Sequence, residues 1–331
     1  MKTKRSLNGP MQVSEDIFED IRCCVCGNTD KKAFTVKYQK SNFAVVTCNS
    51  CNLHFIPPYY RKKIDYGNYK DEKVTEAVRK GNNWVKVQRH KLRFDFIKKY
   101  KPSGDLFDLG AGWGHFMLAG KELGYNVYGI EISEQPYLYS KNDLKLPVDH
   151  IDFFAMKEDK QYDIVTLWDV LEHIDEADKF VEKIARITKK DGILVLQVPQ
   201  IDSYFAKKHK DNWKMMGLDH VNYFGKDTIT ILLEKYGFKV EKIKSSFELK
   251  LFIMYTILPL LKRIKGTSKA KTTQEANYEI KASERQNYFN KFTSRPMWQL
   301  KLFVFIHNII YNLLSFFNIG EEMMVVARKV K

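Results

Sequence analysis

The stretch that most constrains the fold of this chain is a glycine-rich turn that follows a short apolar run. Residues 105–109 form the run, and Gly110, Gly112 and Gly114 then alternate with other residues before an amphipathic segment, His115 to Leu123. Glycine suits a sharp turn from strand to helix against which a ligand can press. The spacing is not the G-x-G-x-x-G of dinucleotide-binding folds. We therefore expect a strand, a turn and a helix that border a pocket for a nucleoside.

A second apolar run supports this pocket. Residues 125–130 are strand-like and are followed by Glu131, a position from which a carboxylate can accept hydrogen bonds from ribose hydroxyls. Further strands and helices then alternate, as in a parallel sheet covered on both faces, so the fold class is α/β with a Rossmann-like seven-stranded sheet. The expected strands are 146–152, 162–167, 193–198, 238–243 and 323–328, and the expected helices lie within 70–100, 177–188 and 226–236.

The five cysteines all lie between Cys23 and Cys51. Two C-x-x-C pairs, Cys23 with Cys26 and Cys48 with Cys51, have the spacing of two metal-binding knuckles that complete a four-sulfur site. Zinc is the usual metal of a closed structural site, and iron remains an alternative. We expect Cys24 not to be a ligand, and the zinc ribbon to be structural.

Composition narrows the class of protein less than the motifs do. The chain has 331 residues, 44% of them hydrophobic and 29% charged, as in ordinary globular proteins. Its net charge of +15 fits an acidic partner or a lysine-rich proteome. No secretory signal and no apolar run of membrane-spanning length is evident, so we expect a cytoplasmic location.

About eighty residues before the last strand exceed what the sheet requires. Residues 262–301 contain ten basic residues and three acids, and residues 298–317 form an apolar helix with one polar stripe. This helical insertion before the last strand has three readings: peripheral contact with a membrane surface, a cap on the protein's own sheet, or a dimer contact. The oligomeric state stays open.

The predicted organisation has four parts. Residues 1–60 form a leader and the zinc ribbon, and residues 61–104 form a helical linker region. Residues 105–246 together with 320–331 form the nucleoside-binding domain. Residues 247–319 form the basic and apolar helical insertion.

Three motifs together resemble a known family. Residues 108–114, 129–133 and 167–174 are similar to the motifs of class I S-adenosylmethionine-dependent methyltransferases. The third motif and residues 190–192 resemble, more narrowly, a subfamily of bacterial surface-sugar and nucleotide-sugar pathways whose members often carry an amino-terminal four-cysteine ribbon. The resemblance covers roughly residues 20–245 and the closing strand.

The resemblance implies S-adenosylmethionine as the cofactor and assigns its contacts. Asp108 would reach the methionine ammonium group, and Glu131 both ribose hydroxyls. The glycines would admit the cofactor's methionine and ribose. Asp152 would contact the adenine amino group. The remaining cofactor-binding residues assigned in this way are Ile132 after the second strand, and Trp168 and Asp169 beside the sulfonium.

His220 is the candidate general base, since residues 219–224 resemble the family's E-H-x-x-Y-F segment. Asp219 would orient the imidazole and raise its basicity. His173 is a rival that in the family pattern shapes the pocket. Gly217 stands where relatives that methylate a sugar carbon have tyrosine, which favours O-methylation.

The activity implied is O-methylation of a sugar in a surface glycan, in its nucleotide-sugar precursor or in a lipid-linked intermediate. An RNA methyltransferase and a cofactor-binding scaffold without turnover are the alternatives. The cysteine ribbon is not rich in lysine, arginine and exposed aromatic residues, so nucleic acid is not favoured as a partner.

Overall fold

The computed structural model describes residues 15–40, 42–61, 79, 83–246, 290–292, 294–316 and 320–331. The leader before residue 15, most of the stretch 62–82 and the insertion from 247 to 289 lie outside these residues. The expectations for those segments are therefore not addressed by the fold.

A seven-stranded sheet organises the main body, in the order β10-β11-β8-β7-β4-β5-β6. All neighbouring pairs from β8 to β6 are parallel, whereas β11 runs antiparallel to both of its neighbours. This is the expected α/β sheet of the methyltransferase fold. Its strands are β4 (Asp105–Leu109), β5 (Asn126–Ile130), β6 (Val148–Asp149), β7 (Tyr162–Trp168), β8 (Thr188–Pro199), β10 (Phe238–Ser246) and β11 (Glu322–Lys329).

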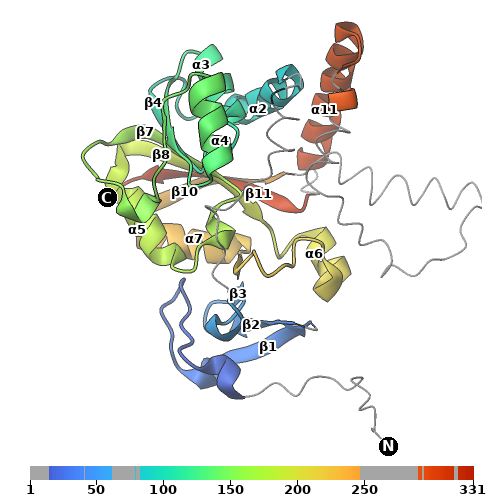
Figure 1. The fold of residues 1–331 in the computed structure, drawn as a ribbon. Coiled ribbons are helices and arrows are strands. Elements are labelled where there is room, and N and C mark those ends of the chain that lie inside the picture. Colours follow the sequence, from blue (N-terminus) through green and yellow to red (C-terminus); the bar gives the residue numbers. More distant parts are fainter. Residues whose placement is uncertain are drawn as a thin grey trace, which may run out of the picture.

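Helices cover both faces of this sheet (Figure 1). On one face lie α2 (Trp84–Ile97), α3 (His115–Glu122) and α4 (Glu134–Leu138). On the other face lie α5 (Ala177–Ile187) and α7 (Lys226–Lys235). The central strands are buried on both sides, as their uninterrupted apolar runs require, and the two faces have separate apolar clusters.

Most of the expected elements are confirmed within a few residues, and one is wrong. The third strand, expected over 146–152, is only the two residues of β6. Asp152 lies beyond it and begins a short 3-10 helix (Phe153–Ala155), where its side chain accepts a hydrogen bond from the Phe154 N–H. β6 pairs only with Gly129 and Ile130 at the end of β5, and the 3-10 helix capped by Asp152 ends the extended backbone.

The cysteine-bearing part forms a second sheet that is not independent of the first body. Its order is β1-β2-β3-β9, and β9 (Asn222–Tyr223) comes from the part of the chain that also carries the seven-stranded sheet. The other strands are β1 (Phe34–Gln39), β2 (Ala44–Cys48) and β3 (His54–Phe55). The pairing of β3 with β9 joins the ribbon to the segment that carries His220.

The last helix, α11 (Met297–Phe316), stands beside α2 and packs on β10 (Figure 1). Leu300, Val304, His307 and Tyr311 face inward and are buried. Among the described residues, no helix has both the length and the apolar character needed to cross a membrane. A short helix, α6 (Tyr204–His209), lies between the sheet and the ribbon.

Candidate active site

The glycine turn folds tightly over the end of β5. Gly110, Gly112 and Gly114 all have positive φ angles, of 76°, 53° and 73°. The N–H groups of Gly110 and Ala111 donate to the carbonyl of Ile130 at 3.0 and 2.9 Å. A Cβ at Gly114 would lie 2.7 Å from Leu146 Cδ1, whereas one at Gly112 would meet nothing within 4 Å. The open side of the turn is therefore at Gly112, where a ligand can approach the backbone.

Glu131 is fixed by this turn before any ligand is present. Its two carboxylate oxygens accept hydrogen bonds from the N–H of Gly112 and from the N–H of Ser133, each at 2.7 Å. The side chain is 7% exposed. Each carboxylate oxygen accepts more than one hydrogen bond, so both keep capacity for a diol. The neighbouring Ile132 is exposed, and its carbonyl is 2.8 Å from His150 Nε2.

Asp108 lies deeper, at the end of β4. It is 1% exposed and accepts a hydrogen bond from Thr166 Oγ1 at 2.7 Å. Burial raises the pKa of Asp108 to about 8, against the opposing effects of the Thr166 hydrogen bond and the charge of Arg93. A buried carboxyl group with this pKa favours a cationic ligand that restores its charge.

Arg93, on α2, is a site residue that the sequence reasoning missed. Its guanidinium lies 4.1 Å from the centroid of the Trp168 ring. Burial lowers the pKa of Arg93, while the charge of Asp169 acts in the opposite direction. Arg93 and Asp108 therefore place one basic and one acidic side chain in the same region. The helical spacing predicted α2 but carried no signal that this arginine turns toward the sheet.

Trp168 is the last residue of β7, and Asp169 follows it at the same edge. Asp169 has a positive φ of 57° and accepts hydrogen bonds from Gln197 Nε2 at 3.1 and 3.2 Å. The same Gln197 amide donates to Glu322 Oε2 at 2.9 Å. A cavity of about 310 Å³ opens here between α2 and α11. Its polar lining residues are Arg89, His90, Arg93, Asp169, Gln197, Ser246, His307, Tyr311 and Glu322.

The two histidines of the motifs come together. The ring centroids of His173 and His220 are 4.8 Å apart, and His173 Nδ1 is 2.6 Å from the carbonyl of Asp219. Burial lowers the pKa of His220 to about 4, with the nearby His173 adding to the shift. His220 is therefore neutral at physiological pH and carries a lone pair.

Asp219 does not hold His220 in the way that the sequence predicts. Its Oδ2 lies 3.9 Å from His220 Nε2, beyond hydrogen-bonding distance, and its side chain is 62% exposed. Asp152 likewise uses a carboxylate oxygen to cap a 3-10 helix. A more deeply placed acid is Glu172, which is 1% exposed. Burial, followed by the charge of Asp169, raises its pKa well above the usual value.

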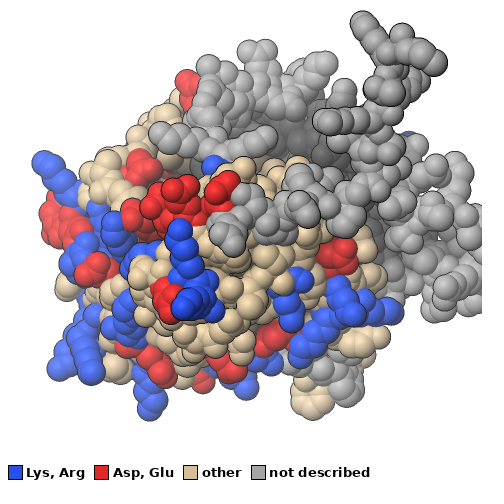
Figure 2. Space-filling view, turned by 90° about the horizontal axis from the view of Figure 1, so that it is seen from below, with Lys and Arg blue, Asp and Glu red and all other residues tan. Residues whose placement is uncertain are grey.

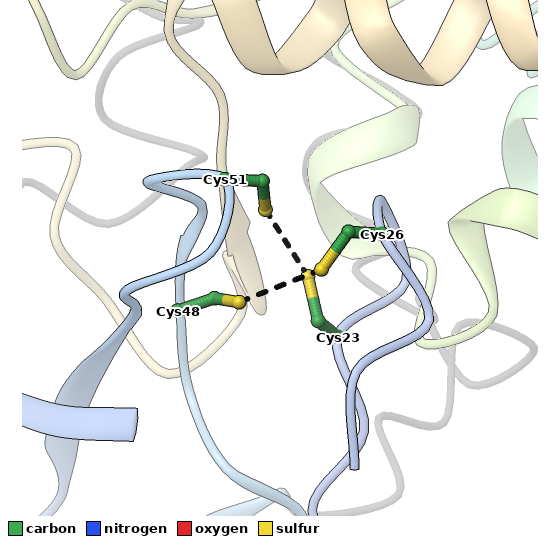
Figure 3. Close-up of side chains that lie close together, drawn as sticks. All are labelled: Cys23, Cys26, Cys48 and Cys51. Atoms are coloured by element: carbon green, nitrogen blue, oxygen red, sulfur yellow. Dashed lines mark hydrogen bonds between the residues drawn. The ribbon is translucent and has the colours of Figure 1, made fainter. Parts of the chain in front are cut away.

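The four paired cysteines converge as predicted, and Cys24 does not join them (Figure 3). Cys23 Sγ is 3.5 Å from Cys51 Sγ, and Cys26 Sγ is 3.6 Å from Cys48 Sγ. Sulfurs that share a tetrahedral zinc ion are about 3.8 Å apart, so the donor set fits a four-thiolate site. Asn52 adopts the left-handed conformation, with φ 64°, in the place of the expected knuckle glycine.

Known proteins were compared with this chain at the level of sequence and of fold. Residues 85–243 match the family model described as "Methyltransferase domain". An uncharacterised protein of Methanocaldococcus jannaschii is 23% identical over 153 residues, which cover 45% of this chain and 72% of that protein. A ubiquinone biosynthesis O-methyltransferase of Rickettsia typhi is 27% identical over 115 residues, which cover 33% of this chain and 45% of that enzyme.

Among solved structures, an S-adenosylmethionine-dependent methyltransferase from Archaeoglobus fulgidus aligns with a TM-score of 0.45 and 19% identity, covering 75% of this chain and 95% of that one. The match to the ubiquinone O-methyltransferases spans about half of their length. Residues 85–243 therefore match a methyltransferase domain, and they contain five of the seven strands of the α/β sheet.

Proposed function

We propose that this chain transfers the methyl group of S-adenosylmethionine to an oxygen of a small acceptor. The observation that carries the proposal is the set of charges at the carboxyl edge of the sheet. Asp108 faces the ammonium of the methionine, Arg93 its carboxylate, and Glu131 the ribose hydroxyls. In an open parallel sheet, ligands bind at this edge.

The remaining cofactor contacts follow from the same placement. Gly110, Gly112 and Gly114 admit the nucleoside, and Ile132 offers an exposed apolar side chain to the adenine ring. Asp152 keeps one carboxylate oxygen for the adenine amino group. Trp168 and Asp169 border the sulfonium.

Methyl transfer needs alignment and the loss of one proton. The acceptor oxygen forms a bond to the methyl carbon, the carbon–sulfur bond breaks, and its electron pair returns to sulfur. Alignment can supply about 7–11 kcal/mol, and a general base about 10²–10⁴-fold in rate. His220 is the proposed base, and Asp219 tunes it electrostatically without a hydrogen bond. His173 lies against it and shapes the pocket.

The acceptor side is the polar cavity between α2 and α11, whose mixture of arginine, histidine, amide and hydroxyl groups suits a hydroxylated ligand. We propose a sugar-containing small molecule or a lipid-linked sugar. Zinc in the four-cysteine site holds the ribbon, and the four predicted units remain the proposed organisation, with β9 shared between two of them.

A lipid-linked acceptor would bring the chain to a membrane surface. Eight large apolar side chains of α11 are 45–80% exposed: Met297, Trp298, Leu302, Phe305, Ile306, Ile309, Leu313 and Phe316. On the face shown in Figure 2, basic and acidic side chains of the described residues are interspersed, so that face presents no continuous basic surface for nucleic acid. Sedimentation with anionic vesicles at low salt tests the membrane contact. Protein that stays in the supernatant would rule this contact out.

Calorimetric titration with S-adenosylhomocysteine tests the proposed function itself. We expect micromolar binding to the purified protein, and its loss in Glu131→Ala. If the folded, metal-loaded protein does not bind S-adenosylhomocysteine, the methyltransferase proposal is wrong. The alternative of a scaffold without turnover would then have no identified ligand.

A further inference from the structure

The most anomalous group in the described part of the chain is the carboxylate of Glu172. It follows β7 in a short 3-10 helix, Leu171–His173, and is 1% exposed. Neither of its oxygens has a hydrogen-bond partner among the described residues. An unsatisfied buried carboxyl group costs several kcal/mol unless a proton, a water or a cation satisfies it.

Two imidazoles stand beside this carboxylate. His173 Nε2 is 3.9 Å from Glu172 Oε1. The other ring nitrogen of His173 lies against the Asp219 carbonyl, and donation to that carbonyl leaves the lone pair of the neutral ring on Nε2. A backbone carbonyl that orients a histidine in this way is the usual outer partner of a metal ligand.

His220 completes the group from a different segment. Its Nδ1 is buried and has no hydrogen-bond partner among the described residues. One ligand atom from each of Glu172, His173 and His220 can be chosen so that all lie within 4.8 Å of one another. Ligands on one tetrahedral ion are about 3.4 Å apart, so inward movements of at most about 0.8 Å per side chain would bring them onto a common ion.

We propose that Glu172, His173 and His220 bind a divalent transition-metal ion, in addition to the metal of the four cysteines. Two nitrogens and one carboxylate oxygen suit zinc, iron(II), cobalt(II) or manganese(II), whereas the four thiolates select zinc or iron. Three protein ligands leave coordination positions open, as in catalytic sites.

Binding of a metal ion here does not depend on the proposed function. The role of that ion in the reaction does rest on the proposed methyl transfer. A cation here would bind the acceptor hydroxyl and stabilise its oxyanion, with the proton passing to solvent. The lone pair of His220 would then serve coordination, so the cation would replace the imidazole as the means of removing the proton.

Manganese(II) is the probe that separates the two metal sites, because thiolates bind it poorly. Protein that carries a single equivalent of zinc per chain, held by the four thiolates, is titrated with manganese(II), and the free ion is followed by electron paramagnetic resonance. We expect one bound manganese per chain, with a Kd at least tenfold higher in Glu172→Gln and in His220→Asn. His209→Ala is the matched control, because His209 is an exposed histidine outside the cluster, and it should bind as the wild type does.

Zinc content gives a second measurement. After dialysis against micromolar zinc, we expect two zinc ions per chain in the wild type and one in His220→Asn. One zinc in the wild type, with manganese binding equal in the wild type and Glu172→Gln, would overturn the proposal.

Titration of the same samples with S-adenosylhomocysteine keeps the two proposals apart and shows that each variant is folded. Normal binding of that ligand without a second cation would refute this site alone. A second cation without binding of that ligand would refute the proposed function.

Discussion

Two parts of the proposed site differ in how far their polar groups are satisfied. The proposed cofactor half is formed by Asp108, Glu131 and the glycine turn, and the proposed acceptor half by Glu172, His173 and the segment 217–224. In the cofactor half, Glu131 already accepts two backbone hydrogen bonds, and the glycine turn is bonded to Ile130. In the acceptor half, Glu172 and His220 retain buried polar atoms without hydrogen-bond partners among the described residues. The first half is built to hold one shape, whereas the second needs a ligand, water or ion to complete it.

The halves also differ in what supports them. The cofactor half rests on β4, β5 and the turn between β4 and α3, which are close in sequence. The acceptor half depends on the ribbon, because β3 pairs with β9 and the Ile56 N–H donates to the Val221 carbonyl at 2.9 Å. Cys24 Sγ lies 3.5 Å from Asn222 Oδ1 and adds a side-chain contact. Unfolding of the ribbon should therefore disturb the acceptor half more than the cofactor half.

The largest expected effect comes from removing the ribbon metal. Structural zinc contributes about 10–16 kcal/mol in zinc-finger peptides, so Cys48→Ser should unfold the ribbon. Hydrogen exchange should then rise over residues 217–224 and change little over 105–131, and the Kd for S-adenosylhomocysteine should change less than about threefold. Equal increases in exchange in both halves would show that the two are not separable in this way.

The next effect is confined to the cofactor half. Glu131→Ala removes two charge-assisted hydrogen bonds to the ribose, each worth about 1.5–3 kcal/mol, and should weaken S-adenosylhomocysteine binding at least 100-fold by calorimetry. Glu134→Ala, an acid on the following helix, is the matched control and should bind normally. If Glu131→Ala binds within a few-fold of the wild type, the ribose lies elsewhere.

Two glycines of the same turn should differ in their effect on stability. Gly114→Ala places a Cβ 2.7 Å from Leu146 Cδ1 at a positive φ, and should cost about 2–4 kcal/mol in the free energy of unfolding. Gly112→Ala has the φ penalty alone, about 1–2 kcal/mol. Urea denaturation measures both, and equal losses would contradict the described packing.

The smallest effect is a dependence on pH. Because burial raises the pKa of Asp108 to about 8, this group is largely protonated in the free protein at pH 6.5 and ionises as the pH rises. The ammonium of the ligand needs the ionised form, so the Kd for S-adenosylhomocysteine should fall about 25-fold between pH 6.5 and 8.5. The variant Asp108→Asn should bind S-adenosylhomocysteine weakly, and its Kd should no longer change with pH in this range. A wild-type Kd that rises with pH would contradict the assignment.

Local pattern was sufficient for much of the fold. Strand β4, the glycine turn and α3 were predicted because alternating apolar runs and glycine spacing act over a few residues. The cysteine knuckles were predicted for the same reason. The bounds predicted for the strand over 146–152 were wrong because β6 pairs only with Gly129 and Ile130 of β5, and the sequence of the run does not show where that pairing stops.

The acceptor half could be predicted only in fragments. His220 and His173 stood in separate motifs, and their contact depends on how the 217–224 segment packs against the 3-10 helix after β7. Arg93 and Glu172 were not singled out, since an arginine on a helix or an acid in a motif shows its burial only after folding. Asp219 was expected to bond His220, but its side chain points toward solvent.

The sequence by itself determined the α/β class of the domain, the four-cysteine group and the acids that end β4 and follow β5, because each depends on residue types at short, fixed spacings. The tertiary structure alone decided that the ribbon pairs with β9, that Arg93 approaches Trp168 and that α11 lines the polar cavity. Those contacts join residues far apart in the chain, and only the packing of layers and sheet edges brings them together.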